Sequence, residues 1–266
     1  MFDILRIRLL DLASDIVNIS EFIYYFFNFL FLNRQKYISN YLENNQNKKY
    51  ALCLANGPSF SHINDFLKHN KREEFVLVTV NKSFTSNNYK KLNPDFHVIV
   101  DSKLIKGEWK MDILKQIKNL SPQTKICLNA KWINNKNLKS YCNKVGIKPI
   151  WLSGSFIPTP FARYVLRPLL RENILGGAVS ENAVNLCSKI GLKKIFLLGV
   201  DCNGSFLELF DKNAYGEGIK PHQNLIKKND LNFISSLIAN SYALLSWKRL
   251  IDYYMSNGIK IKIIGA

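Results

Sequence analysis

The sequence is poor in the residues that build metal sites and disulfide frameworks. Only five of its 266 residues are cysteine and four are histidine. The number of cysteines is odd, no two are spaced Cys-x-x-Cys, and Cys53 and Cys127 lie inside apolar runs. These features disfavour a zinc site or a disulfide framework and predict buried thiols in a reducing compartment. No His-Glu-x-x-His motif occurs, so metal-dependent hydrolysis has little support.

Acidic residues are also scarce, since 20 Asp and Glu stand against 37 Lys and Arg and leave a net charge of +17. Hydrophobic residues nevertheless make up 47% of the chain, which excludes a disordered polycation. The charge favours an anionic partner: nucleic acid, an acidic membrane or a phosphorylated substrate. The lysines are scattered and no RNA-binding signature occurs, so a basic nucleic-acid-binding or scaffold protein is the weaker alternative.

No apolar run is long enough to cross a bilayer. The longest, Phe22–Leu32, is about half of the roughly 20 residues required, and Arg34 and Lys36 follow it. Two interpretations stay open: a helix that covers an apolar face of the main domain or of a partner subunit, or a helix that lies in the membrane interface. The sequence therefore predicts a helical appendage over residues 1–48 and one large domain over residues 49–266.

The larger domain alternates short apolar segments with longer, helix-like ones. Seven segments are predicted as strands: Tyr50–Leu54, Phe75–Val80, Phe96–Val100, Lys125–Leu128, Pro149–Leu152, Lys194–Leu198 and Lys260–Ile264. Most are continuously apolar, which is typical of strands buried on both faces of a parallel sheet. The helices predicted between them include Phe60–His69, Trp109–Lys118, Ser180–Ile190 and Leu231–Met255. The expected fold is α/β, a Rossmann-like, doubly wound, mostly parallel sheet of about seven strands with an N-terminal apolar helical appendage.

Small and hydrogen-bonding residues follow six of the predicted strands. They are Asn56-Gly57-Pro58-Ser59, Asn81, Asp101-Ser102, Asn129, Ser153-Gly154-Ser155 and Gly199-Val200-Asp201. Part of this pattern is ordinary turn chemistry. Because open α/β sheets bind ligands at the carboxyl ends of their strands, the pattern also predicts a polar ligand site at one edge of the sheet.

Two glycine motifs stand between a strand or loop and a helix. In Asn56-Gly57-Pro58-Ser59 the glycine permits a tight turn, and the amides of the following helix could hold a phosphate. The alternative is an ordinary turn in which Ser59 caps the helix. Gly176-Gly177 opens a second helix that carries Ser180. Neither motif is a Gly-x-Gly-x-x-Gly or Walker sequence, which disfavours dinucleotide-binding and P-loop proteins.

In combination these motifs resemble those of bacterial sialyltransferases and related enzymes that use CMP-activated ulosonic acids, including Kdo-type transferases. The same framework is similar to pterin diphosphokinase-like proteins. The resemblance spans roughly residues 49–266 and implies a nucleotide-sugar site, to which Asp101 is added from the strand ends. The predicted site residues are Asn56, Gly57, Ser59, Asn81, Asp101, Gly177, Ser180, Gly199 and Asp201.

The resemblance further implies an inverting, metal-independent transfer to a cell-surface glycan such as lipopolysaccharide or capsule, with a histidine base and a tyrosine on the leaving phosphate. His222 is the only histidine between the sixth strand and the last helix, and Tyr215 lies near it. An imidazole that titrates near neutrality suits proton removal from a sugar hydroxyl. A loop histidine without a catalytic role is the open alternative.

The expected partners are a CMP-activated sugar, a glycan or glycolipid acceptor, and the anionic inner face of the cytoplasmic membrane. No cofactor, metal or nucleic acid is expected, the expected location is cytoplasmic, and self-association into a homo-oligomer stays open. The alternative activity, a pterin-type diphosphokinase, would use ATP and magnesium, with Asp101 and Asp201 as candidate ligands.

Overall fold

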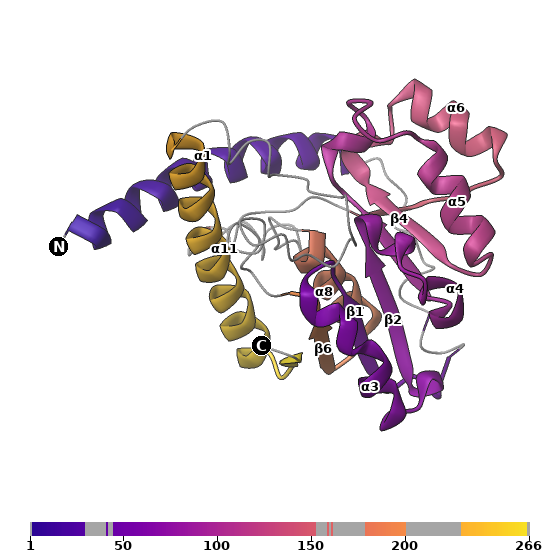
Figure 1. The fold of residues 1–266 in the computed structure, drawn as a ribbon. Coiled ribbons are helices and arrows are strands. Elements are labelled where there is room, and N and C mark those ends of the chain that lie inside the picture. Colours follow the sequence, from indigo (N-terminus) through magenta and orange to yellow (C-terminus); the bar gives the residue numbers. More distant parts are fainter. Residues whose placement is uncertain are drawn as a thin grey trace.

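The computed structural model describes residues 2–29, 41, 45–152, 159, 161, 179–200 and 230–264. Its centre is a sheet of seven strands in the order β5-β4-β3-β2-β1-β6-β7, in which all neighbours pair in parallel (Figure 1). The strands are β1 (Tyr50–Leu54), β2 (Phe75–Val80), β3 (Phe96–Ile99), β4 (Lys125–Asn129), β5 (Ile150–Leu152), β6 (Lys194–Leu198) and β7 (Lys260–Ile264). The predicted Rossmann-like α/β fold is therefore confirmed, and each predicted strand is present to within one residue at its ends.

The helices agree with the sequence less closely than the strands do. They are α1 (Phe2–Phe29), α3 (Ile63–Lys68), α4 (Tyr89–Leu92), α5 (Asp112–Leu120), α6 (Lys136–Lys144), α8 (Val179–Ile190) and α11 (Asp230–Ser256). Short 3-10 helices are η1 (Pro58–His62), η2 (Arg72–Glu74), η3 (Asn81–Thr85), η4 (Ser102–Leu104) and η5 (Ala130–Trp132). The helix predicted at 60–69 is divided between η1 and α3, and the one predicted at 109–118 begins three residues later, at Asp112. Neither α4 nor α6 was predicted, because one is a single turn and the other is mostly polar.

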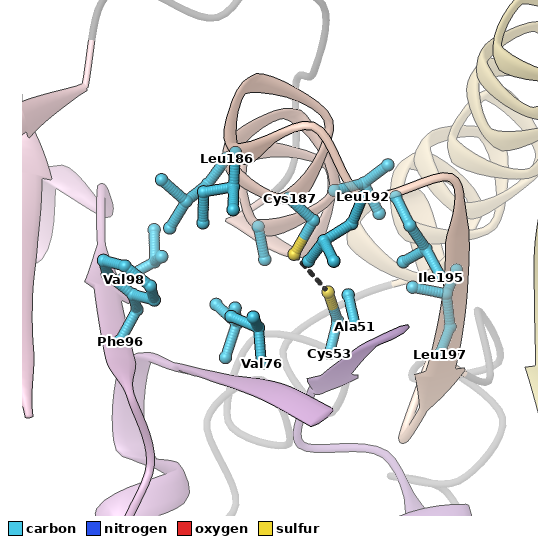
Figure 2. Packing of buried hydrophobic residues seen from close by; sticks show 14 of the residues in the cluster. Ala51, Cys53, Val76, Phe96, Val98, Leu186, Cys187, Leu192, Ile195 and Leu197 are labelled. Atoms are coloured by element: carbon cyan, nitrogen blue, oxygen red, sulfur yellow. Dashed lines mark hydrogen bonds between the residues drawn. The ribbon is translucent and has the colours of Figure 1, made fainter. Parts of the chain in front are cut away.

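Helices cover both faces of the sheet because successive residues of a buried strand point to opposite sides. Alternate strand residues such as Leu52 and Leu77 pack with Ile63 of α3 on one face. Their neighbours, such as Cys53, pack with Cys187 of α8 and with α11 on the other face (Figure 2). A third cluster joins β3 and β4 to α5 and α6 on the α3 side.

The cysteines of the described residues are free and buried, as the sequence predicts: Cys53, Cys127, Cys142 and Cys187. The Sγ atoms of Cys53 and Cys187 lie 3.6 Å apart between β1 and α8 (Figure 2). Burial raises the pKa of the Cys187 thiol. The protonated, apolar thiol therefore serves here as a packing residue. Cys202 lies outside the described residues.

The described side chains of α1 that contact the domain lie on one face of the helix. Arg249 of α11 donates two hydrogen bonds to the carboxylate of Asp11, at 2.6 and 2.8 Å, and buried Asn18 donates to Thr159. Large apolar residues on the remaining surface of α1 are exposed, among them Leu9 and Ile16. Part of the helix thus covers the domain, while contact of its exposed surface with a membrane stays a prediction, as does the division into 1–48 and 49–266. Within the described ranges, no helix combines the length and the apolar character needed to span a bilayer.

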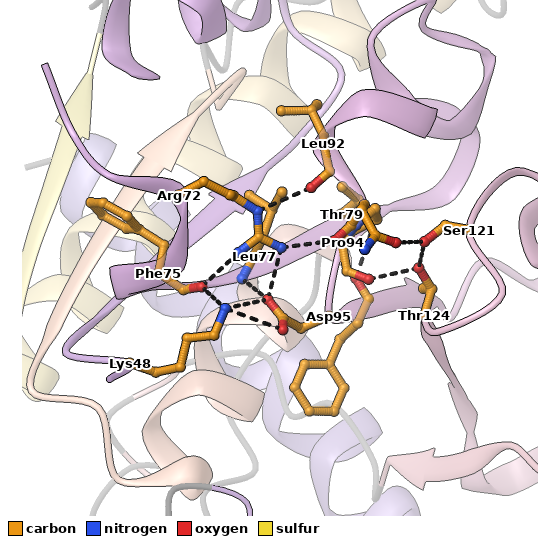
Figure 3. A network of polar contacts seen from close by, with 12 residues as sticks. Lys48, Arg72, Phe75, Leu77, Thr79, Leu92, Pro94, Asp95, Ser121 and Thr124 are labelled. Carbon is orange, nitrogen blue, oxygen red and sulfur yellow. Dashed lines mark hydrogen bonds and ion pairs between the residues drawn. The ribbon is translucent and has the colours of Figure 1, made fainter. Parts of the chain in front are cut away.

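Asp95 joins the amino ends of the central strands (Figure 3). Its Oδ2 accepts the backbone N–H of Leu77 at 2.8 Å and a guanidinium N–H of Arg72 at 3.1 Å, while Oδ1 accepts the hydroxyl of Tyr41 at 2.8 Å. The Lys48 ammonium lies 3.4 Å from Oδ1. Burial lowers the pKa of Lys48, and the charge of Asp95 opposes that shift. One half-buried carboxylate thus holds two cations and fixes the start of β3 against β2.

Replacing this carboxylate should destabilise the fold markedly. We expect Asp95→Ala to lower the free energy of unfolding by about 3 kcal/mol, because Lys48 and Arg72 would be left half-buried without their anion. Urea unfolding at pH 7 measures the loss. The control is Asp65→Ala, which breaks a solvent-exposed pair with Lys68 and should change the free energy of unfolding far less. Equal losses in the two variants would contradict the role assigned to Asp95.

Candidate functional site at the carboxyl edge of the sheet

The strand order reverses between β1 and β6. The chain adds β2 to β5 on one side of β1 and then returns to place β6 and β7 on the other side. Doubly wound sheets bind ligands at such a reversal, outside the carboxyl ends of the strands. Two motifs lie there: Gly57 and Ser59 follow β1, and Gly199 follows β6. The fold therefore brings together two motifs that are 140 positions apart.

Three hydrogen bonds tie the ends of β1 and β6. The N–H of Ala55 donates to the carbonyl of Leu198, and the N–H of Gly57 donates to the carbonyl of Gly199, both at 2.8 Å. The N–H of Gly199 donates to the buried Ser59 Oγ at 2.8 Å. No side chain caps η1, so the alternative in which Ser59 acts as a helix cap is wrong. Ser59 instead fixes the first motif to the end of β6.

Gly199 must be a glycine for two independent reasons. Its φ is +78°, in the left-handed region that favours glycine. A Cβ atom on Gly199 would lie 2.5 Å from the carbonyl oxygen of Ala55 and 3.2 Å from the amide nitrogen of Gly57. The two strand ends can approach this closely only because no side chain separates them.

The helix that follows the first motif is short. It consists of the five-residue η1 and the six-residue α3, in place of one continuous helix. The sequence predicts that a phosphate could bind at the positive end of one longer helix. The dipoles of the two short helices that are present give such binding little support. Gly57 itself has an ordinary φ of −74°. The contribution of this segment is the close contact with Gly199.

Asn81 follows β2 directly and has an unusual conformation. Its φ is +46°, and its backbone carbonyl accepts a hydrogen bond from His97 Nε2 at 2.8 Å. Asn81 Oδ1 and Ser83 Oγ are the two buried side-chain N or O atoms without a hydrogen-bond partner in the part of the chain that the structure describes. A buried polar atom without a partner costs on the order of 1–3 kcal/mol. Two such atoms just after the end of β2 mark a candidate position for a polar ligand.

Two other predicted strand ends serve local turns. Asp101 Oδ1 accepts the N–H of Lys103, and Asn129 Oδ1 accepts the N–H of Lys131, both at 3.0 Å. These contacts cap η4 and η5 and match ordinary turn chemistry. The described part of the site is therefore concentrated at β6, β1 and β2, and a role for Asp101 in nucleotide binding stays a prediction.

The other predicted site residues fall in two groups. Ser180 is buried near the start of α8, which packs across β1, β2 and β3. Asn56 is half-buried two residues after the end of β1. Gly177, Asp201, Tyr215 and His222 lie outside the described residues. No group of three metal-ligating side chains occurs among the residues that the structure describes.

Sequence reasoning missed His97, which lies in the middle of β3 and is fully buried. Its Nδ1 lies 2.8 Å from the hydroxyl of Thr79 and 2.9 Å from the hydroxyl of Tyr89. Burial lowers the pKa of His97 to about 4, so the ring is neutral near pH 7. A single imidazole inside the otherwise apolar segment Phe96–Ile99 was the signal that could have identified it.

The close approach at Gly199 predicts a large effect of adding one methyl group. We expect Gly199→Ala to lower stability by more than Gly107→Ala, since both positions have a positive φ but only Gly199 faces backbone atoms. The control, Gly107→Ala, should lower the free energy of unfolding by about 1–2 kcal/mol, because alanine must adopt the left-handed backbone there. Thermal and urea unfolding measure both variants. Equal costs would show that the strand ends can separate to admit a side chain.

Comparison with known proteins gives one family and a set of solved structures. The family model described as "6-hydroxymethylpterin diphosphokinase MptE-like" matches residues 26–205. No curated protein matches the chain. The similar solved structures include the sialyltransferase CstII from Campylobacter jejuni with cytidine-5'-monophosphate, at 16% identity and a TM-score of 0.43, covering 81% of this chain and 79% of that one. An apo α-2,3-sialyltransferase from Campylobacter jejuni has 14% identity and a TM-score of 0.44, covering 82% of this chain and 76% of that one.

Both groups that the motifs resemble thus recur among the similar proteins. The family match begins in the last part of α1, runs through the motif after β1 and the segment after β2, and ends just beyond Gly199. The matched range includes all the residues whose hydrogen bonds tie the ends of β1 and β6, and it covers well over half of the chain. The chain belongs to the 6-hydroxymethylpterin diphosphokinase MptE-like family.

Proposed function

We propose that this protein is an inverting glycosyltransferase that moves a sialic acid or Kdo-type sugar from its CMP donor to a cell-surface glycan. The observation that carries the proposal is the arrangement at the sheet reversal. Ser59 and Gly199 are hydrogen-bonded to one another there, and Asn81 Oδ1, which follows the neighbouring strand β2, is buried without a partner. These are positions that the sialyltransferase resemblance assigns to the nucleotide sugar.

The chemistry of these groups suits a nucleotide. A buried amide oxygen can accept a hydrogen bond from a ribose hydroxyl or an exocyclic amine, and a hydroxyl such as that of Ser83 can both donate and accept. The net charge of +17 favours association with a donor that carries a phosphate and a carboxylate, and with an anionic membrane surface that carries the acceptor.

The proposed reaction is a direct displacement. His222 removes the proton of the acceptor hydroxyl, and the acceptor oxygen forms a bond to the anomeric carbon of the sugar. The bond from that carbon to the CMP phosphate oxygen breaks, and CMP departs with the electron pair. Tyr215 donates a hydrogen bond to the departing phosphate. The configuration inverts, and the step needs neither a covalent enzyme intermediate nor a metal.

A second candidate is the diphosphokinase activity in the name of the family, which would transfer pyrophosphate from ATP to a pterin. Phosphoryl-type transfer from ATP uses magnesium held by carboxylates. One oxygen of Asp101, a candidate ligand, already accepts the N–H of Lys103. The other carboxylate oxygen is left for a ligand, so this contact does not separate the two activities.

Ligand-dependent stability separates the two activities. If the proposal is right, CMP at about 100 times its Kd should raise the free energy of unfolding by about 2.7 kcal/mol, and ATP with magnesium should have little effect. Asn81→Ala should abolish the CMP effect, whereas the exposed control Asn87→Ala should retain it. Stabilisation by ATP with magnesium and not by CMP would support the kinase and overturn the transferase.

A variant at His222 tests the catalytic base. We expect His222→Ala to retain CMP binding and to lose roughly 100-fold or more of the transfer rate, which is the usual contribution of a general base. The exposed His69→Ala is the matched control and should transfer at the wild-type rate. A CMP-sugar transfer assay with a glycan acceptor measures both. Wild-type turnover by His222→Ala would remove this residue as the base.

A further inference from the structure

We propose that His97 is a positioning residue for the nucleotide site, which holds the backbone of Asn81 so that its side-chain amide faces the ligand. The proposal rests on the nucleotide-binding role proposed for the carboxyl edge of the sheet. His97 itself does not touch the ligand, since it is fully buried inside β3.

The contacts of the ring determine which nitrogen carries the proton. The carbonyl oxygen of Asn81 can only accept, so Nε2, at 2.8 Å, must donate to it. Nδ1 is then the acceptor, and the hydroxyls of Tyr89 and Thr79 lie at hydrogen-bonding distance from it. The carbonyl of Asn81 therefore selects the Nε2–H tautomer, and a neighbouring hydroxyl can donate to the unprotonated Nδ1. The depressed pKa of His97, about 4, keeps this arrangement uncharged in the neutral range.

Asn81 needs such support because its backbone is strained. A φ of +46° is uncommon for a residue with a side chain, although asparagine tolerates it better than most. The conformation turns the chain from β2 into η3, where Ser83 lies. A hydrogen bond from a rigid, buried ring to the carbonyl of Asn81 favours this turn over an ordinary extended backbone.

The unpartnered atoms indicate why the strain is retained. Asn81 Oδ1 and Ser83 Oγ are both buried without a partner, and both belong to η3, whose first residue is held by His97. Strained residues that the surrounding structure over-determines are typical of ligand sites. A merely structural turn would be expected to satisfy these oxygens within the protein. The contact of His97 thus connects a buried strand to the group that receives the nucleotide.

Calorimetric titration with CMP tests the proposal on the full chain. His97→Gln places an amide N–H near the Nε2 position and should bind CMP within about threefold of wild type, because it retains the donor to Asn81. His97→Leu and the shorter His97→Asn lack a donor at that position, and their Kd should rise by about 10-fold or more. Ile117→Ala, a core change in α5, should lower the melting temperature without changing the Kd.

The variant pairs keep the proposal falsifiable even if His97→Leu does not fold, since the amides of Gln and Asn differ only in reach. Equal Kd values for His97→Gln and His97→Asn, or a wild-type Kd for folded His97→Leu, would overturn it. A ¹⁵N spectrum of the His97 ring without ligand is the second readout. It should show the neutral Nε2–H tautomer at pH 7, and a Nδ1–H tautomer or a charged ring would overturn the proposal.

Failure of the proposed function gives a different result. If wild type binds ATP with magnesium but not CMP, the transferase is wrong, and the same variants are titrated with ATP. If His97→Gln then binds ATP more tightly than His97→Leu and His97→Asn do, the positioning role of His97 is still supported. Equal affinities would overturn it.

Discussion

The contact between the carboxyl ends of β1 and β6 is the constraint on which the site depends. Gly199 lies so close to Ala55 that no Cβ fits between them, and its amide is bound by Ser59. This contact joins β1 to β6 at the position where the strand order of the sheet reverses. At this contact the backbone of Ala55, Gly57 and Gly199 meets the hydroxyl of Ser59, and only Gly199 has to lack a side chain.

The two edges of the sheet differ in how fully their polar groups are satisfied. At the amino edge, Asp95 binds Arg72, Lys48 and a backbone amide, so that its carboxylate oxygens have their partners within the protein. At the carboxyl edge, Asn81 and Ser83 retain buried oxygens without partners. The amino edge thus satisfies its polar groups internally, while the carboxyl edge keeps unused capacity for hydrogen bonds at these two oxygens.

The two candidate activities share a need for a bound nucleotide and differ in their need for a metal. Both need a nucleotide held at the carboxyl edge, which the arrangement around Ser59, Gly199 and Asn81 suits. They differ in the metal, because pyrophosphate transfer from ATP requires carboxylates arranged around magnesium and sugar transfer from CMP does not. Family membership is therefore compatible with either activity, and ligand binding decides between them.

The sequence by itself determined the strands, because short, continuously apolar segments bounded by turn residues are typical of strands buried on both faces of a parallel sheet. It also identified the motif residues Asn81, Ser59 and Gly199. It could not predict that Ser59 binds Gly199, because that contact depends on β6 returning beside β1 across the sheet. The support of Asn81 by His97 likewise depends on the pairing of β2 with β3, which only the tertiary structure decided. Local sequence fixes which segments are extended, whereas contacts between distant segments follow from how the strands are ordered in space.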